Sequence, residues 1–140
     1  MSIEELFSQL KNREDMLFLE AATLNDIKDF EHKNNIQLPK SFKDWLLLSD
    51  GGDLYLPAGV QFYGVSHKPL IEVDSDDSPD KSYVVIGSLS MGDPIVFKNG
   101  TEAISIYNHE EARIDTDETF CDFDSFLQNL PGVIGLEEEY

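Results

Sequence analysis

The stretch that decides the fold is LPKSFKDWLLLSDGG, residues 38–52. Pro39 favours a helix start, because its φ angle is already set for a first helical turn and it has no N–H left to pair there. Phe42 and Trp45 then recur at helical spacing on one apolar face, and the two glycines at the end of the stretch close the helix. We therefore predict a helix here, with the buried rings of Phe42 and Trp45 anchoring the domain.

Three other segments have helical periodicity, and each begins at a residue that can cap a helix. They start at Ser2, Thr23 and Asp122. The second should end at Asn34-Asn35, since asparagine tolerates the left-handed conformation of a helix end, and the last should end at Pro131-Gly132. The chain should therefore have three helices near its start and one near its end.

From residue 54 the apolar period changes to that of strands, in short runs at residues 54–56, 60–64, 70–73, 83–86, 95–97 and 103–107. Asn99-Gly100 lies between the last two runs and predicts a hairpin with a type I′ turn, whose two central residues need positive φ. Helices, then a mixed or antiparallel β-sheet, then a helix form an α+β pattern. We expect residues 1–140 to form one such domain.

The chain is strongly acidic, with 28 Asp and Glu against 10 Lys and Arg and a net charge of -18 over 140 residues. Because 41% of the residues are hydrophobic, we expect a folded domain with a real core despite this charge. The negative field repels nucleic acid and anionic lipid, so neither is an expected partner. One acidic cluster lies at residues 72–80. A second follows Arg113, after which the chain has no Lys or Arg but has acids at residues 115, 117, 118, 122, 124 and 137–139.

The first residues carry acids where a secretory signal carries bases, and no apolar run approaches the roughly 18 residues of a membrane span. We therefore expect a cytoplasmic protein without a membrane segment. The single cysteine, Cys121, excludes an internal disulfide and leaves no zinc-ligand spacing, which fits a reducing compartment. We expect its thiol to be half-buried and structural.

The motifs that begin like enzyme or metal sites are incomplete. His109-Glu110-Glu111-Ala112-Arg113 starts like the zinc-protease helix, but Arg113 stands where a second histidine must share the metal. The acidic runs at residues 74–80 and 115–119 lack the glycine and the glutamate of a calcium loop, so weak and nonspecific cation binding is all they leave open. A catalytic pair among the 28 acids also stays open, but their abundance makes it uninformative. We expect no enzyme, no catalytic residue, no cofactor and no specific metal site.

A series of short motifs resembles the SUKH superfamily, which includes many bacterial toxin-immunity proteins and a fungal regulator of cell-wall synthesis. The motifs are Phe30-Glu31, Leu38-Pro39-x-x-Phe42-x-x-Trp45-Leu46, Asp50-Gly51-Gly52, Ile86-Gly87-Ser88, Gly92-Asp93, Tyr107-Asn108-His109-Glu110 and Phe123-Asp124-Ser125-Phe126-Leu127. They come in the order that the superfamily shows, over roughly residues 20–130. Pro94 directly after Gly92-Asp93 and the long acidic loop at residues 72–80 depart from its pattern.

The resemblance implies a curved sheet flanked by helices and a protein that binds another protein. Its members often neutralise a toxin of the same strain, frequently a nuclease, so we expect an immunity protein whose acidic surface occupies the basic site of a cognate toxin. The alternative is a regulatory or scaffold module of the same fold with an endogenous partner, and the oligomeric state stays open. The residues expected at the contact surface are Glu72, Asp74, Asp76, Asp77, Asp115, Asp117 and Glu118.

Overall fold

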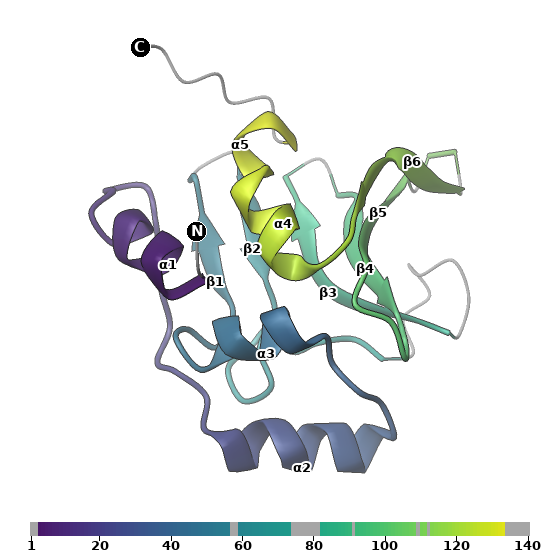
Figure 1. Cartoon of the computed structure of the whole chain (residues 1–140), viewed down its shortest axis with the longest axis horizontal. Helices are drawn as coiled ribbons and strands as arrows, with labels where there is room; N and C mark the ends of the chain where they lie inside the picture. Colours follow the sequence, from purple (N-terminus) through teal and green to yellow (C-terminus); the bar gives the residue numbers. More distant parts are fainter. Residues whose placement is uncertain are drawn as a thin grey trace.

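The computed structural model describes residues 3–56, 59–73, 82–90, 92–108, 110–111 and 113–133, and of residues 115–118 it describes the backbone only. In chain order the described elements are α1 (Ile3–Leu10), α2 (Leu24–Asn34), α3 (Lys40–Leu46), β1 (Gly52–Leu54), β2 (Val60–Phe62), β3 (Tyr83–Leu89), β4 (Pro94–Lys98), β5 (Ile104–Asn108), β6 (Arg113–Phe120), α4 (Phe123–Gln128) and α5 (Leu130–Val133). Helices precede and follow a block of strands, which confirms the predicted α+β fold (Figure 1).

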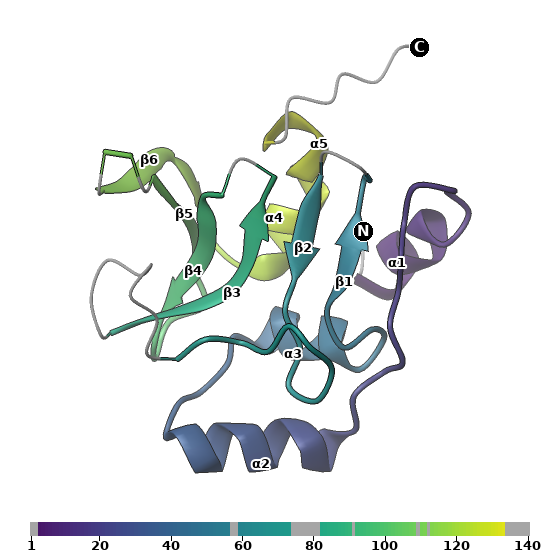
Figure 2. The ribbon, with the colours of Figure 1, turned by 180° about the vertical axis from the view of Figure 1, so that it is seen from behind.

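The described strands form one antiparallel sheet in the order β1-β2-β3-β4-β5-β6, so each strand pairs with its neighbour in sequence. Figure 1 shows α1, α3 and α4 on one face of this curved sheet, while α2 lies along its lower end. Seen from behind in Figure 2, the opposite face has no described helix over it. The antiparallel alternative of the sequence prediction is therefore confirmed.

The core lies between the helices and the sheet and is built around Trp45. This side chain is fully buried, and its ring centroid lies 6.0 Å from that of Phe62 and 6.2 Å from that of Phe123. Phe42 packs edge-on against Phe123 at 4.9 Å. The indole Nε1 donates a hydrogen bond of 3.0 Å to the carbonyl of Gly51, so its polar end is satisfied. The prediction that Phe42 and Trp45 anchor the fold is confirmed.

The predicted helix caps at both ends of α2 and at the start of α4 are present. Thr23 and Asp26 form a reciprocal capping box, in which the Asp26 N–H donates to Thr23 Oγ1 at 3.1 Å and the Thr23 N–H to Asp26 Oδ2 at 3.0 Å. Asn35 closes α2 in the left-handed conformation, with φ 53°. Asp122 accepts the N–H of Ser125 at 2.8 Å and so caps α4.

Two predicted helix ends are wrong. α3 ends at Leu46 and not at the glycines, because residues after it bond across the molecule: the Asp50 N–H donates to the carbonyl of Glu20, and Gly52 already belongs to β1. Pro131-Gly132 does not end the last helix but lies within α5, where a proline in the first turn is tolerated. The side chain of Asn129 closes α4 instead, donating to the carbonyl of Ser125 at 2.8 Å.

The hairpin between β4 and β5 is present, but its turn is not type I′. Gly100 has φ 91°, whereas Asn99 is not left-handed, which is the φ pattern of a type II turn. The Thr101 N–H closes this turn on the carbonyl of Lys98 at 3.0 Å. Asn99 instead uses its side-chain oxygen to accept the N–H of Gln37 at 3.1 Å, a contact with the chain before α3.

The run at residues 115–119, which lies outside all the predicted strands, belongs to strand β6. Ser105 pairs with Thr119 and Tyr107 with Ile114, so the four residues 115–118 lie opposite Ile106 alone and form a bulge. Conversely, the predicted strand at residues 70–73 makes only isolated bridges, from Leu70 to Gly64 and from Glu72 to Val85.

The predicted half-buried thiol is also wrong, because Cys121 is exposed. It lies between β6 and α4, and its Sγ is 3.3 Å from the hydroxyl of Ser125.

Candidate protein-interaction surface

A fully buried carboxylate, that of Asp50, organises the loop that follows β2. Its Oδ1 accepts the N–H of Val65 at 2.7 Å, and its Oδ2 accepts the N–H groups of Ser66 and His67 at 2.9 and 2.8 Å. The ring Nδ1 of His67 also lies 2.8 Å from Oδ2. We call these four hydrogen bonds the Asp50 anchor. A buried carboxylate needs such donors, and here consecutive backbone amides of the loop supply three of them.

Two glycines make room for the Asp50 anchor. Gly64 passes so close to Asp50 that a Cβ on it would lie 2.7 Å from the carboxylate Oδ1. Gly51 has φ 98°, and a Cβ there would lie 2.7 Å from the carbonyl of Phe62. The Asp-Gly-Gly triplet of the sequence therefore has a structural use, which is to hold the segment 64–71 at a fixed place beside the sheet.

That segment forms one wall of a groove whose other wall is α2. The groove has a volume of about 420 Å³ and is lined by Asp26, Asp29, Phe30, Lys33, Asn34, Val65, Ser66, Leu70 and Ile71. We call it the α2 groove. Figure 2 shows the loop after β2 descending from the sheet toward α2. Leu24, at the start of α2, and Leu70 are unusually exposed for leucines, at 54% and 40%.

The groove carries one carboxylate with a perturbed pKa. Hydrogen bonds to the backbone and then to the side chain of Thr23 lower the pKa of Asp26, and attraction to the His67 charge lowers it further. Asp26 is therefore an anion over a wide pH range. Sequence reasoning missed this groove, because its walls are 31 to 45 residues apart in the chain and only the α2 wall has a recognisable pattern.

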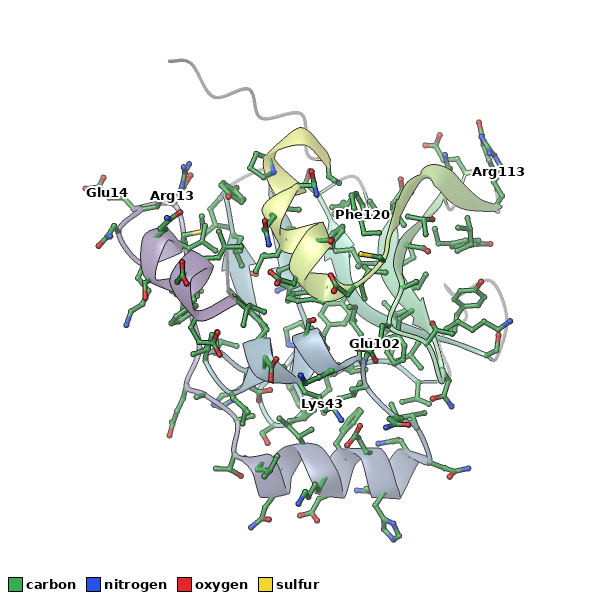
Figure 3. All side chains as sticks on the ribbon, viewed as in Figure 1. Arg13, Glu14, Lys43, Glu102, Arg113 and Phe120 are labelled. Carbon is green, nitrogen blue, oxygen red and sulfur yellow. The ribbon has the colours of Figure 1, made fainter. Side chains whose placement is uncertain are left out.

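The predicted contact residues do not form one cluster in the described structure. Asp74, Asp76 and Asp77 lie outside the described residues. Asp115, Asp117 and Glu118 belong to β6, the last strand of the sheet, within its bulge. Figure 3 shows Phe120 near α4 and Arg113 at the far tip of the same strand.

Glu72 shares a row of paired residues with β6, on the face of the sheet away from the helices. The row runs Glu72, Val85, Val96, Ser105 and Thr119, one residue on each neighbouring chain segment. Four steps of about 4.8 Å between strands place Glu72 about 19 Å from β6. Directly paired residues point to the same face, so Glu72 lies at the opposite end of this row from β6, the strand that carries residues 115–118.

A second paired row, Asp53, Gln61 and Ser88, crosses β1, β2 and β3 on this same face. All three are half-buried, and they line a hollow of about 330 Å³ together with Leu56, Gly59, Val60, Leu89 and Ser90. We call the two rows together the open face, because no described helix covers it, although Val85, Val96 and Ser105 of the first row are buried. In the second row the half-buried polar residues alternate with buried Leu54, Phe62 and Ile86, which is the pattern of strands covered on one side only.

The part of the chain that the structure describes has no group of three or more His, Cys, Asp or Glu side chains that could hold a metal ion. Among those same residues, no helix has the length and apolarity to cross a membrane.

Comparison with known proteins assigns the family. A comparison with curated proteins gave no match. The family model of the SMI1 / KNR4 family (SUKH-1) matches residues 21–129, which include α2, α3, the whole described sheet and α4. The match contains the Asp50 anchor and both walls of the α2 groove. With most of its length matched, the chain belongs to the SMI1 / KNR4 family (SUKH-1).

Proposed function

We propose that this protein is an immunity protein that binds a cognate toxin and neutralises it by covering a basic site. The observation that carries the proposal is the net charge of -18 on a domain of 140 residues from a family of protein-binding domains. The resemblance described above extends to toxin-immunity proteins, and the charge supplies a physical way for such a protein to work. We place it in the cytoplasm, where the toxin acts.

The charge acts in two stages. Before contact, attraction between an acidic and a basic protein raises the association rate toward about 10⁸ to 10⁹ M⁻¹s⁻¹ at low salt. At physiological salt the field reaches only about 8 Å, so final placement depends on local contacts. A nuclease holds its substrate phosphates with basic residues, and carboxylates displayed by a folded domain can occupy the same positions.

The open face supports this proposal as a contact surface. No described helix covers it, and it carries half-buried polar side chains at Asp53, Gln61 and Ser88. The end of the open face opposite β1 borders β6. We propose Asp115 and Asp117 of this strand as toxin contacts. Of the rest of the proposed contact set, Glu72 belongs to the row that ends at this strand.

The test is co-purification of the tagged protein with the product of the gene immediately upstream, followed by growth rescue when that product is made in the cytosol. A stable one-to-one complex together with rescue supports immunity. A complex without toxicity of the partner supports the alternative, a regulatory or scaffold module of the same fold. The absence of any complex and any toxicity refutes the proposal for that pair.

A further inference from the structure

We propose that the α2 groove receives an arginine side chain of the protein partner. This groove is then a specific contact site in addition to the acidic strand β6. This inference rests on the proposed function for the identity of the partner, and its own chemistry is tested separately below. The groove is the largest hollow described above, and three features of its lining support this occupant.

The first feature is the apolar floor. Phe30 of α2 and Val65, Leu70 and Ile71 of the facing segment give the groove an apolar base. A long cationic side chain buries its aliphatic stem on such a surface and keeps its charged head at the rim. Leu70 is 40% exposed, so its side chain is open to cover by an incoming group.

The second feature is the charge along α2. Asp26 and Asp29 are three residues apart, which places their Cβ atoms on one helix face within about 5–6 Å. The side chain of Asp29 is exposed and makes no hydrogen bond or ion pair with any residue that the structure describes. Two carboxylates at this spacing suit the planar guanidinium, whose five N–H groups reach two acceptors at once, better than they suit a lysine ammonium. Lys33 lies one turn further along α2 and repels a cation. An incoming guanidinium is therefore expected at the end of the groove that carries Asp26 and Asp29.

The third feature is that both walls are held in place before binding. The Asp50 anchor fixes residues 65–67 with hydrogen bonds of 2.7 to 2.9 Å. α2 is capped at both ends, by the Thr23 box and by Asn35. A groove whose walls are already ordered loses little conformational entropy when a side chain enters, which favours binding.

The groove chemistry is tested without the partner. The probe is the blocked tripeptide acetyl-Ala-Arg-Ala-amide, titrated into ¹⁵N-labelled protein, with the uncharged isostere in which citrulline replaces arginine as control. We expect saturable shifts of the amides of α2 and residues 65–71, a dissociation constant on the order of millimolar, and about ten-fold weaker binding of the citrulline peptide. D29N should weaken arginine-peptide binding several-fold. Shifts outside the groove only, or equal shifts with both peptides, would overturn the inference.

A second experiment uses the complex from the co-purification. D29K and E14K each change the net charge by the same amount, but Glu14 lies beyond α1, away from α2 (Figure 3). We expect D29K to raise the dissociation constant by about ten-fold or more and E14K by less than about three-fold. Equal effects of the two variants would show that only long-range charge matters and would overturn the groove as a contact, while the immunity proposal would stand. If no complex forms, the immunity proposal fails, and the peptide titration alone decides the groove.

Discussion

Removal of the Asp50 carboxylate should destabilise the protein far more than removal of any surface acid. In D50A, the N–H groups of Val65, Ser66 and His67 lose an acceptor at 2.7 to 2.9 Å. A hydrogen bond to a charged group contributes about 1.5–3 kcal/mol, so three of them at the low end amount to about 4–5 kcal/mol. Water reaches the exposed Ser66 and replaces part of this, so we expect a loss of about 3 kcal/mol.

The assay is urea denaturation followed by the fluorescence of Trp45. With an m-value of about 1.5 kcal/mol/M, the expected loss lowers the midpoint by about 2 M. The control is D53A, three residues on, where the carboxylate is half-buried on the open face and we expect less than about 0.5 kcal/mol. Hydrogen exchange should also show lost protection at residues 65–67 in D50A alone. A midpoint change below about 0.5 M, or unchanged protection at these amides, would refute the structural role of the anchor.

Three further results are expected. T23A removes the α2 cap and should reduce the free energy of unfolding by about 1 kcal/mol in urea melts, and equal midpoints would contradict the capping geometry. The lowered pKa of Asp26 means that its contribution is complete above the ordinary aspartate value and is lost as pH falls through the lowered one. D26N should therefore be less stable than the wild type at pH 7, and the difference should shrink as pH falls below the ordinary aspartate value, whereas a constant difference would exclude this linkage. Replacing Asp74, Asp76 and Asp77 by Asn should slow association with the partner and flatten its salt dependence in stopped-flow measurements, and unchanged rates at low salt would remove these acids from the contact surface.

The local signals in the sequence predicted the helices well, because each depends on a few neighbouring residues. Thr23 and Asp122 cap helices by bonding a backbone N–H three residues away, and Asn35 adopts its left-handed conformation without help from distant groups. The apolar face with Phe42 and Trp45 was equally readable, since three or four residues of helix bring both rings to one side.

The failures have a common physical cause, which is that distant contacts overrode a local preference. Asn99 prefers a type I′ turn before glycine, but its side chain bonds to Gln37, more than 60 residues away. The acids of residues 115–118 disfavour a strand, yet pairing of Ile114 and Thr119 with β5 carries them into one.

In the candidate site, too, features that depend on neighbouring residues could be predicted and features that depend on distant contacts could not. The sequence named Asp50-Gly51-Gly52 as a family motif, but it could not show that the carboxylate of Asp50 holds a loop 15 to 17 residues further along the chain. The α2 groove depends on the position of that loop, so the spacing of apolar residues in the sequence could not predict it. The predicted acids were chosen by abundance in short runs, and the structure separates Glu72 from β6 by three strands.

The bulge in β6 has a consequence for how this protein behaves at high concentration. An open antiparallel sheet ends in a row of backbone groups that can recruit the edge of another molecule and so begin aggregation. At one end of this sheet, Leu17 exchanges backbone hydrogen bonds with Asp53 and so covers β1. At the other end, the bulge and the acidic sequence of residues 115–118 interrupt the row. The protein can therefore reach a high concentration without its sheets joining edge to edge.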